Sequence, residues 1–224
     1  MILFWIAFGG FFFGLTYGLL QICTELPIVR RERFAGIGLV PYLFSKVVVL
    51  APLLALVDLV LLGLLRALDR LPPLPAGAFG SMYLTLLLAT VAALGLGLLC
   101  SAAVSDASQA TLALPMLCFP QVLFVGAILP VPLMAPVGRA MSYLMSNRWS
   151  FEALGHAVDL PSRWRQGRSP LGPPLLADYG TSFDRPEWQN QLLLGGFAVV
   201  FLLAAWAVLT YRVADGRHGR RPRG

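Results

Sequence analysis

Five long apolar stretches dominate this sequence, and each is long enough to form a helix that crosses a lipid bilayer. Spanning the hydrocarbon core takes about 20 predominantly apolar residues of helix. The stretches lie at residues 2–22, 43–65, 79–103, 112–134 and 191–211. Apolar residues make up 58% of the chain and charged residues 12%, too few to cover the surface of a water-soluble domain of 224 residues. The sequence therefore predicts an all-α integral membrane protein, a polytopic helical bundle.

The distribution of basic residues predicts how this bundle is oriented. Lys and Arg gather in loop 25–46 and again in the carboxyl-terminal tail, residues 213–224. Because basic residues in short loops mark the cytoplasmic side, and five spans put both regions on one side, we expect both in the cytoplasm. The amino terminus and segment 135–190 are then outside a cytoplasmic membrane. Because the basic residues flank apolar stretches, we expect membrane lipids, and no nucleic acid, as their partners.

The stretches and their connections suggest one transmembrane domain, residues 1–212, followed by the basic tail. Within the external segment, apolar residues recur at helical spacing over residues 136–154. We interpret this part as short interfacial or re-entrant helices. We expect Trp149, Trp164 and Trp188 at the membrane interface, where an indole ring is stable. The three cysteines lie in or beside apolar stretches without metal-ligand spacing, so we interpret them as buried apolar residues and expect no metal site.

A dense charge cluster, residues 25–34, separates the first two apolar stretches. It predicts a short cytoplasmic helix whose charges dock on a partner surface through charge-assisted hydrogen bonds. The alternative is that its arginines anchor the loop to lipid headgroups.

This cluster resembles the first intracellular loop of G-subfamily ABC exporters, the white and pleiotropic-drug-resistance group. A second segment, Asn147-Arg-Trp-Ser-Phe-Glu-Ala-Leu154, is similar to the pattern that follows the fifth helix of that family. The chain resembles the second to sixth helices, and is closest to the permease part of actinobacterial fusions of FHA, ATPase and membrane segments. The family's first helix and its ATPase domain have no counterpart in this sequence. Positions that match the loop are Arg31, Glu32, Arg33, Gly36, Tyr42 and Lys46.

The resemblance implies the permease part of an ATP-driven exporter, which works as a dimer and is moved by an ABC ATPase. The sequence contains no G-x-x-x-x-G-K-[ST] phosphate loop, so we expect ATP and Mg²⁺ on the partner ATPase and no cofactor or catalytic residue in this chain. The residues implied in coupling to the ATPase are Glu25, Arg30, Arg31, Glu32, Arg33 and Phe34.

The resemblance also implies a cargo path on the dimer axis, between the first and fourth apolar stretches. Aromatic and aliphatic walls suit a hydrophobic or lipid-linked cargo. The alternative is that the same residues pack the bundle or face lipid. The residues implied are Phe8, Phe11, Phe12, Leu15 and Leu19 on one wall and Gln121, Phe124, Val125 and Ile128 on the other.

Other polar residues support different hypotheses. Asp58 is an intramembrane acid, for which a hydrogen bond or pairing with Arg66 is favoured over proton coupling. His156 and Asp159 suggest the alternative of a membrane-embedded acyltransferase with a His base. A third hypothesis is a non-transporting, truncated membrane scaffold. Asp106 is interpreted as a helix cap at a tight turn.

Overall fold

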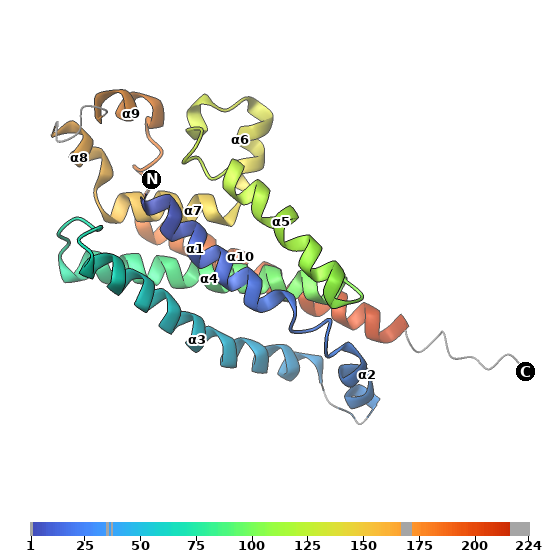
Figure 1. Ribbon diagram of the computed structural model, residues 1–224. Helices are drawn as coiled ribbons and strands as arrows, with labels where there is room; N and C mark the ends of the chain where they lie inside the picture. Colours follow the sequence, from blue (N-terminus) through green and yellow to red (C-terminus); the bar gives the residue numbers. More distant parts are fainter. Residues whose placement is uncertain (1, 35, 37, 167–171, 216–224) are drawn as a thin grey trace, which may run out of the picture.

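The structure, a computed structural model, contains helices and their connections but no strand over the residues it describes, which are 2–34, 36, 38–166 and 172–215. The predicted all-α fold class is confirmed (Figure 1). The helices, in order, are α1 (Ile2–Leu19), α2 (Leu26–Phe34), α3 (Leu39–Ala67), α4 (Ala76–Ala103), α5 (Ala107–Leu123), the 3₁₀ turn η1 (Val131–Leu133), α6 (Pro136–Tyr143), α7 (Ser146–Ala157), α8 (Leu160–Arg165), α9 (Gly172–Tyr179) and α10 (Glu187–Asp215).

Four of the described helices are long and apolar enough to cross a membrane: α1, α3, α4 and the part of α10 from Glu187 to Val213. Helices α3 and α10 extend beyond the predicted stretches 43–65 and 191–211 at both ends. Helix α1 ends at Leu19, three residues before the predicted limit, because the chain turns there toward α2.

Helix α5 differs most from the sequence prediction, which placed a span at residues 112–134. The helix begins at Ala107, since the Asp106 side chain accepts a hydrogen bond from the Gln109 N–H at 2.9 Å and caps the first turn. It ends at Leu123, shortly before Gly126, which has a positive φ of 91°. The helix therefore has 17 residues and a length of about 25 Å. The predicted limits of this span were wrong.

Helix α4 is the centre of the bundle, between α1 and α3 on one side and α10 on the other (Figure 1). Close approach of α1 depends on small residues. A Cβ on Gly14 would lie 2.2 Å from the carbonyl oxygen of Thr90, and one on Gly97 would lie 2.6 Å from that of Leu15. Glycine at these positions lets the two backbones touch, as is common where membrane helices pack.

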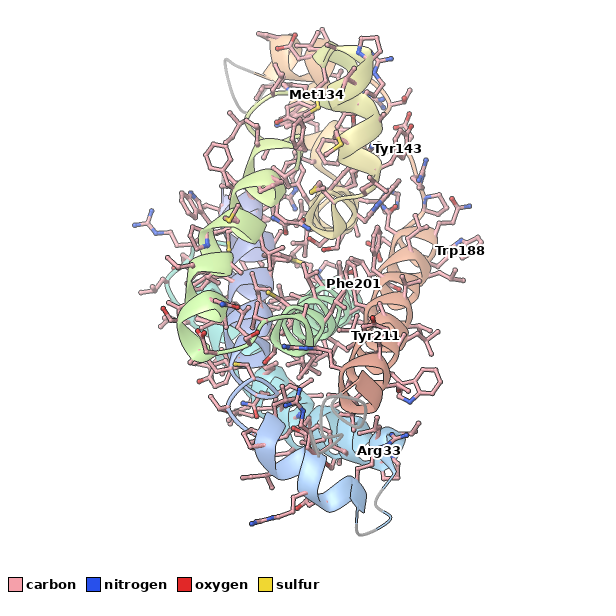
Figure 2. All side chains as sticks on the ribbon, turned by 90° about the vertical axis from the view of Figure 1, so that its right-hand side faces the viewer. Arg33, Met134, Tyr143, Trp188, Phe201 and Tyr211 are labelled. Carbon is pink, nitrogen blue, oxygen red and sulfur yellow. The ribbon has the colours of Figure 1, made fainter. Side chains whose placement is uncertain are left out.

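Helix α7 lies inside the bundle, at the end of the molecule opposite α2, which we call the distal end. Figure 2 shows Met134 and Tyr143 at this end and Arg33 at the other. All residues of α7 from Ser146 to Gly155 are buried, against α1, α4 and α10. The segment predicted to form short helices thus contains α6, which is mostly exposed, and α7, which is buried in the bundle. Trp149 is buried beside Ala89 and Leu194, so its predicted position at the membrane interface was wrong.

Candidate functional site

Helix α2 has one buried apolar side and one exposed basic side. Leu26 and Val29 are buried in a cluster formed by the adjacent ends of α3, α4 and α10. Arg30 and Arg31 are exposed, and Glu32 and Arg33 are half-buried. A short helix of this kind is held in place by its apolar side while its charges remain available to a partner.

The first turn of α2 is tied to α3 by a polar triad, Glu25, Tyr42 and Lys46. The Lys46 Nζ lies 2.6 Å from Glu25 Oε1, and the Tyr42 hydroxyl donates to Glu25 Oε2 at 3.0 Å. Lys46 also donates to Gln21 Oε1 at 3.4 Å. The backbone carbonyl of Glu25 accepts the N–H of Val29 at 3.0 Å, so the residue that pairs with α3 also begins the α2 turn.

The connection before α2 is tied to α4 as well. The backbone N–H groups of Ile22 and Cys23 both donate to Ser101 Oγ, at 2.9 and 3.0 Å. These groups follow the end of α1 and are buried, where an unpaired N–H is costly. Displacement of α2 is therefore opposed by polar contacts to two membrane helices, α3 and α4.

The six predicted coupling residues consequently have different surroundings. Arg30 and Arg31 face outward, as a docking surface requires. The carboxylate of Glu25 instead points to α3, where it positions α2 rather than offering a free charge. The side chain of Phe34 lies outside the described residues. Ser101 was missed by the sequence analysis, because nothing in its local pattern distinguishes it from other small residues of an apolar stretch.

The turn between α4 and α5 lies at the same end of the bundle as α2. Arg212, near the end of α10, donates to the carbonyl oxygens of Ala102, at 2.9 Å, and of Val104, and to Ser105 Oγ at 3.2 Å. It satisfies carbonyls at the carboxyl end of α4, which have no partner within the helix. The end of α10 and the basic loop thus share one end of the molecule. The predicted basic tail lies outside the described residues from residue 216 onward.

The predicted cargo-path residues also divide into two groups. Phe11, Leu15 and Leu19 are buried against Ala93 and Cys118, where α1, α4 and α5 meet. Within this structure those three pack the bundle and do not line an open wall. Val125 is likewise buried, while Phe8 and Phe124 are half-buried. Phe12 and Ile128 have exposed fractions of 37% and 57%.

Gln121, the remaining path residue, connects α5 to α7. Its Oε1 accepts the backbone N–H of Asn147 at 3.0 Å, and both residues are buried. Asn147 is in the first turn of α7, where backbone N–H groups have no partner within the helix. Gln121 therefore caps α7 from a neighbouring helix, a structural role that its sequence position did not indicate.

The second motif contains a buried ion pair within α7. Arg148 Nε lies 2.9 Å from Glu152 Oε1, one helical turn away, and the Arg148 guanidinium also donates to Ser142 Oγ at 2.7 Å. The rings of Tyr143 and Trp149 lie 4.3 and 4.7 Å from its Cζ. Burial raises the pKa of the Glu152 carboxyl, although Arg148 acts in the opposite direction.

Asp58 is fully buried on the face of α3 that packs toward the bundle. Neither carboxylate oxygen has a hydrogen-bond partner among the described residues, and the same holds for the buried Thr90 Oγ1. Arg66, the predicted partner, is exposed and lies 5.4 Å from the centre of the Phe79 ring. The predicted Asp58–Arg66 pair is therefore absent from this structure.

His156 and Asp159 lie at the distal end beside a cavity of about 360 Å³, together with Ser162, Arg165 and Asp184. The Nδ1–H of His156 donates to the backbone carbonyl of Phe183 at 2.9 Å. Asp159 has a left-handed backbone, with φ of 50°, at the end of α7. Its carboxylate does not orient the His156 ring, so the arrangement needed for a His base held by an acid is not formed here.

Together these features define a class: a polytopic helical membrane protein whose first two long helices flank an anchored, basic, exposed helix. The match to a known family agrees with that class. The family model described as ABC-2 type transporter matches residues 1–157, more than half of the chain, and the chain belongs to this family. It is therefore an ABC transporter permease, a membrane component of transport and not itself a catalytic one. A comparison with curated proteins found no match.

Proposed function

We propose that this permease exports a hydrophobic or lipid-linked cargo across the cytoplasmic membrane, driven by an ABC ATPase that binds α2. The observation that carries the proposal is the exposure of Arg30 and Arg31 on a helix whose opposite side is fixed to the bundle. The exposed arginines can form charge-assisted hydrogen bonds with an acidic groove on a partner. Because the opposite side of α2 is fixed to the bundle, the helix can pass on a displacement of that partner.

The contacts of α2 support a route for that force. ATP binding brings the ATPases together, and their movement displaces α2. Glu25 passes this displacement to α3 through Tyr42 and Lys46, while Ser101 passes it to α4. Because α4 is packed closely against α1 and α10, the displacement tilts the bundle as a unit instead of moving one helix.

An exposed apolar stripe on α5 supports a dimer. Leu112, Met116 and Phe119 recur at spacings of four and three residues, which places them on one side of the helix, and all three are largely exposed. We propose that a second copy covers this stripe, and that Phe12 and Ile128 face the cargo between the copies. In this arrangement the amino terminus is outside and the carboxyl terminus is in the cytoplasm.

Removal of two charges from α2 tests the proposal. The chain is purified in mild detergent from membranes of its own host, and ATP hydrolysis in the purified sample is measured. We expect ATPase activity to accompany the unmodified chain and to fall at least about tenfold for Arg30→Ala/Arg31→Ala, since each lost charge-assisted contact contributes roughly 1.5–3 kcal/mol. Equal activity in both samples would overturn the proposal.

Two controls make this result specific. Arg66→Ala/Arg165→Ala removes the same number of exposed charges from the distal end and should leave the associated ATPase activity unchanged. Because fewer basic residues in a loop can alter orientation, a Ser108→Cys substitution in the exposed first turn of α5 is labelled from the cytoplasmic side in both backgrounds. Equal labelling shows that orientation is preserved.

A further inference from the structure

A groove between α1 and α3 opens on the side of the bundle at its distal end. It has a volume of about 350 Å³ and is lined by five apolar residues and a single cation. The volume is at the lower end of the range for ligand pockets. The lining residues are Ile2, Trp5, Ile6, Leu61, Leu65 and Arg70.

The turn after α3 places Arg70 at this groove. Helix α3 ends at Ala67, and Asp69 has a positive φ of 52°. The backbone N–H of Arg70 then donates to the carbonyl of Leu65 at 2.9 Å, which folds the chain back over the end of the helix. Arg70 follows a reversal of the chain and is exposed at the edge of an apolar surface.

Arg70 also differs from the nearest other arginine. Arg66, one turn earlier, lies over the Phe79 ring. Among the described residues, the Arg70 guanidinium takes part in no ion pair, side-chain hydrogen bond or ring contact. Its charge is therefore available to an anion, and the adjoining apolar surface is available to a hydrocarbon chain.

We propose that this groove binds one anionic membrane phospholipid, with its phosphate on Arg70 and an acyl chain between α1 and α3. A guanidinium binds phosphate oxygens in a bidentate geometry, and an exposed Trp5 suits the boundary between headgroups and chains. A helix from another protein would cover the apolar surface but would leave the cation without a counter-charge in a low-dielectric site. This site does not depend on the proposed export function.

Lipid retention measured by native mass spectrometry tests the site on the full chain in detergent. The probes are phosphatidylglycerol and a diacylglycerol with the same acyl chains. We expect the unmodified chain to retain phosphatidylglycerol about tenfold more strongly than diacylglycerol, the equivalent of one charge-assisted hydrogen bond. Arg70→Gln should abolish this preference, whereas Arg66→Gln should preserve it.

A second pair of variants tests the acyl-chain part of the groove. Leu65→Trp fills the groove and should weaken retention of both lipids, whereas Leu64→Trp, at an exposed neighbouring position outside the groove, should not. Glycerol phosphate, which has the headgroup but no chain, should not displace phosphatidylglycerol.

Unchanged preference in Arg70→Gln, or equal effects of the two Trp variants, would overturn the proposal. Displacement by glycerol phosphate would reduce the site to a simple anion site and would also overturn it. If a variant fails to insert into membranes, quenching of Trp5 fluorescence by phosphatidylglycerol with brominated chains serves instead. The difference between the unmodified chain and Trp5→Phe isolates the Trp5 signal, and absence of quenching contradicts the site.

Discussion

Two ion pairs of the described residues lie at opposite ends of this molecule, and each belongs to one of the two motifs recognised in the sequence. The Arg148–Glu152 pair at the distal end has side-chain exposed fractions of 7% and 5%. The Lys46–Glu25 pair beside α2 has fractions of 18% and 38%. The first joins two residues of one helix, and the second joins two different elements of the bundle.

This difference separates a structural motif from a contact surface. Removing two charges from water is costly, and a buried pair with neighbouring hydrogen bonds and rings offsets that cost without leaving a free charge. Arg148 is fully occupied by Glu152, Ser142 and two aromatic rings, so the distal motif fixes α7 in the bundle. Near α2, the pair fixes one side of a helix and leaves Arg30 and Arg31 exposed.

The largest effect is expected from breaking the buried pair. Glu152→Leu leaves Arg148 buried without its counter-charge, and we expect the free energy of unfolding to fall by about 3–5 kcal/mol. Arg148→Met should have a similar effect. The double variant should recover most of the loss, because an apolar pair needs no counter-charge. Unfolding in mixed detergent micelles measures all three, and additive losses would show that the pair is not coupled.

A smaller loss is expected at the link between α5 and α7. Gln121→Leu leaves the buried N–H of Asn147 without its acceptor, which costs about 1–3 kcal/mol. The comparison variant is Gln109→Leu, because the hydrogen bond of Gln109 to the N–H of Ser105 is exposed to solvent and easily replaced by water. Equal losses for the two variants, measured by the same unfolding assay, would contradict the capping role of Gln121.

The partly exposed pair should contribute less to stability but more to coupling. Glu25→Gln or Lys46→Met is expected to lower the free energy of unfolding by at most about 1 kcal/mol. Each should nevertheless weaken the response of ATP hydrolysis to cargo, because the polar link between α2 and α3 is weakened. The associated ATPase should still be retained, in contrast to Arg30→Ala/Arg31→Ala. Loss of retention would show that Glu25 belongs to the docking surface itself.

The smallest expected effect is a dependence of stability on pH at the distal pair. Burial raises the pKa of Glu152 in the folded chain, so the folded state binds a proton at a higher pH than the unfolded state. This contribution to stability is present at low pH and is lost as the pH rises through the folded pKa. A protonated Glu152 still accepts the Arg148 Nε–H through its carbonyl oxygen, whereas the Glu152→Leu variant cannot, so acidification does not reproduce the loss expected for that variant. Thermal unfolding should therefore show a gain on acidification that is absent from Arg148→Met/Glu152→Leu. An identical pH profile in both proteins would contradict it.

The two motifs could be found from sequence because their residues are close together in the chain, but their roles could not be distinguished. Arg148 and Arg31 are both arginines in short polar segments, and local pattern does not indicate that one is buried and the other exposed. Likewise, Gln121 and Leu15 could be placed on helices, but whether they face cargo or a neighbouring helix depends on the partner that packs there.

The sequence by itself determined that this chain is a helical membrane protein and roughly where four of its apolar helices lie, because hydrocarbon admits only segments whose backbone groups pair internally. It also determined which loop carries the exposed basic helix. Only the tertiary structure decided that α7 is buried, that Glu25 points to α3 and that Ser101 fixes the connection before α2. Those contacts join residues from separate helices, and their free energy depends on distances that appear only when the bundle is packed.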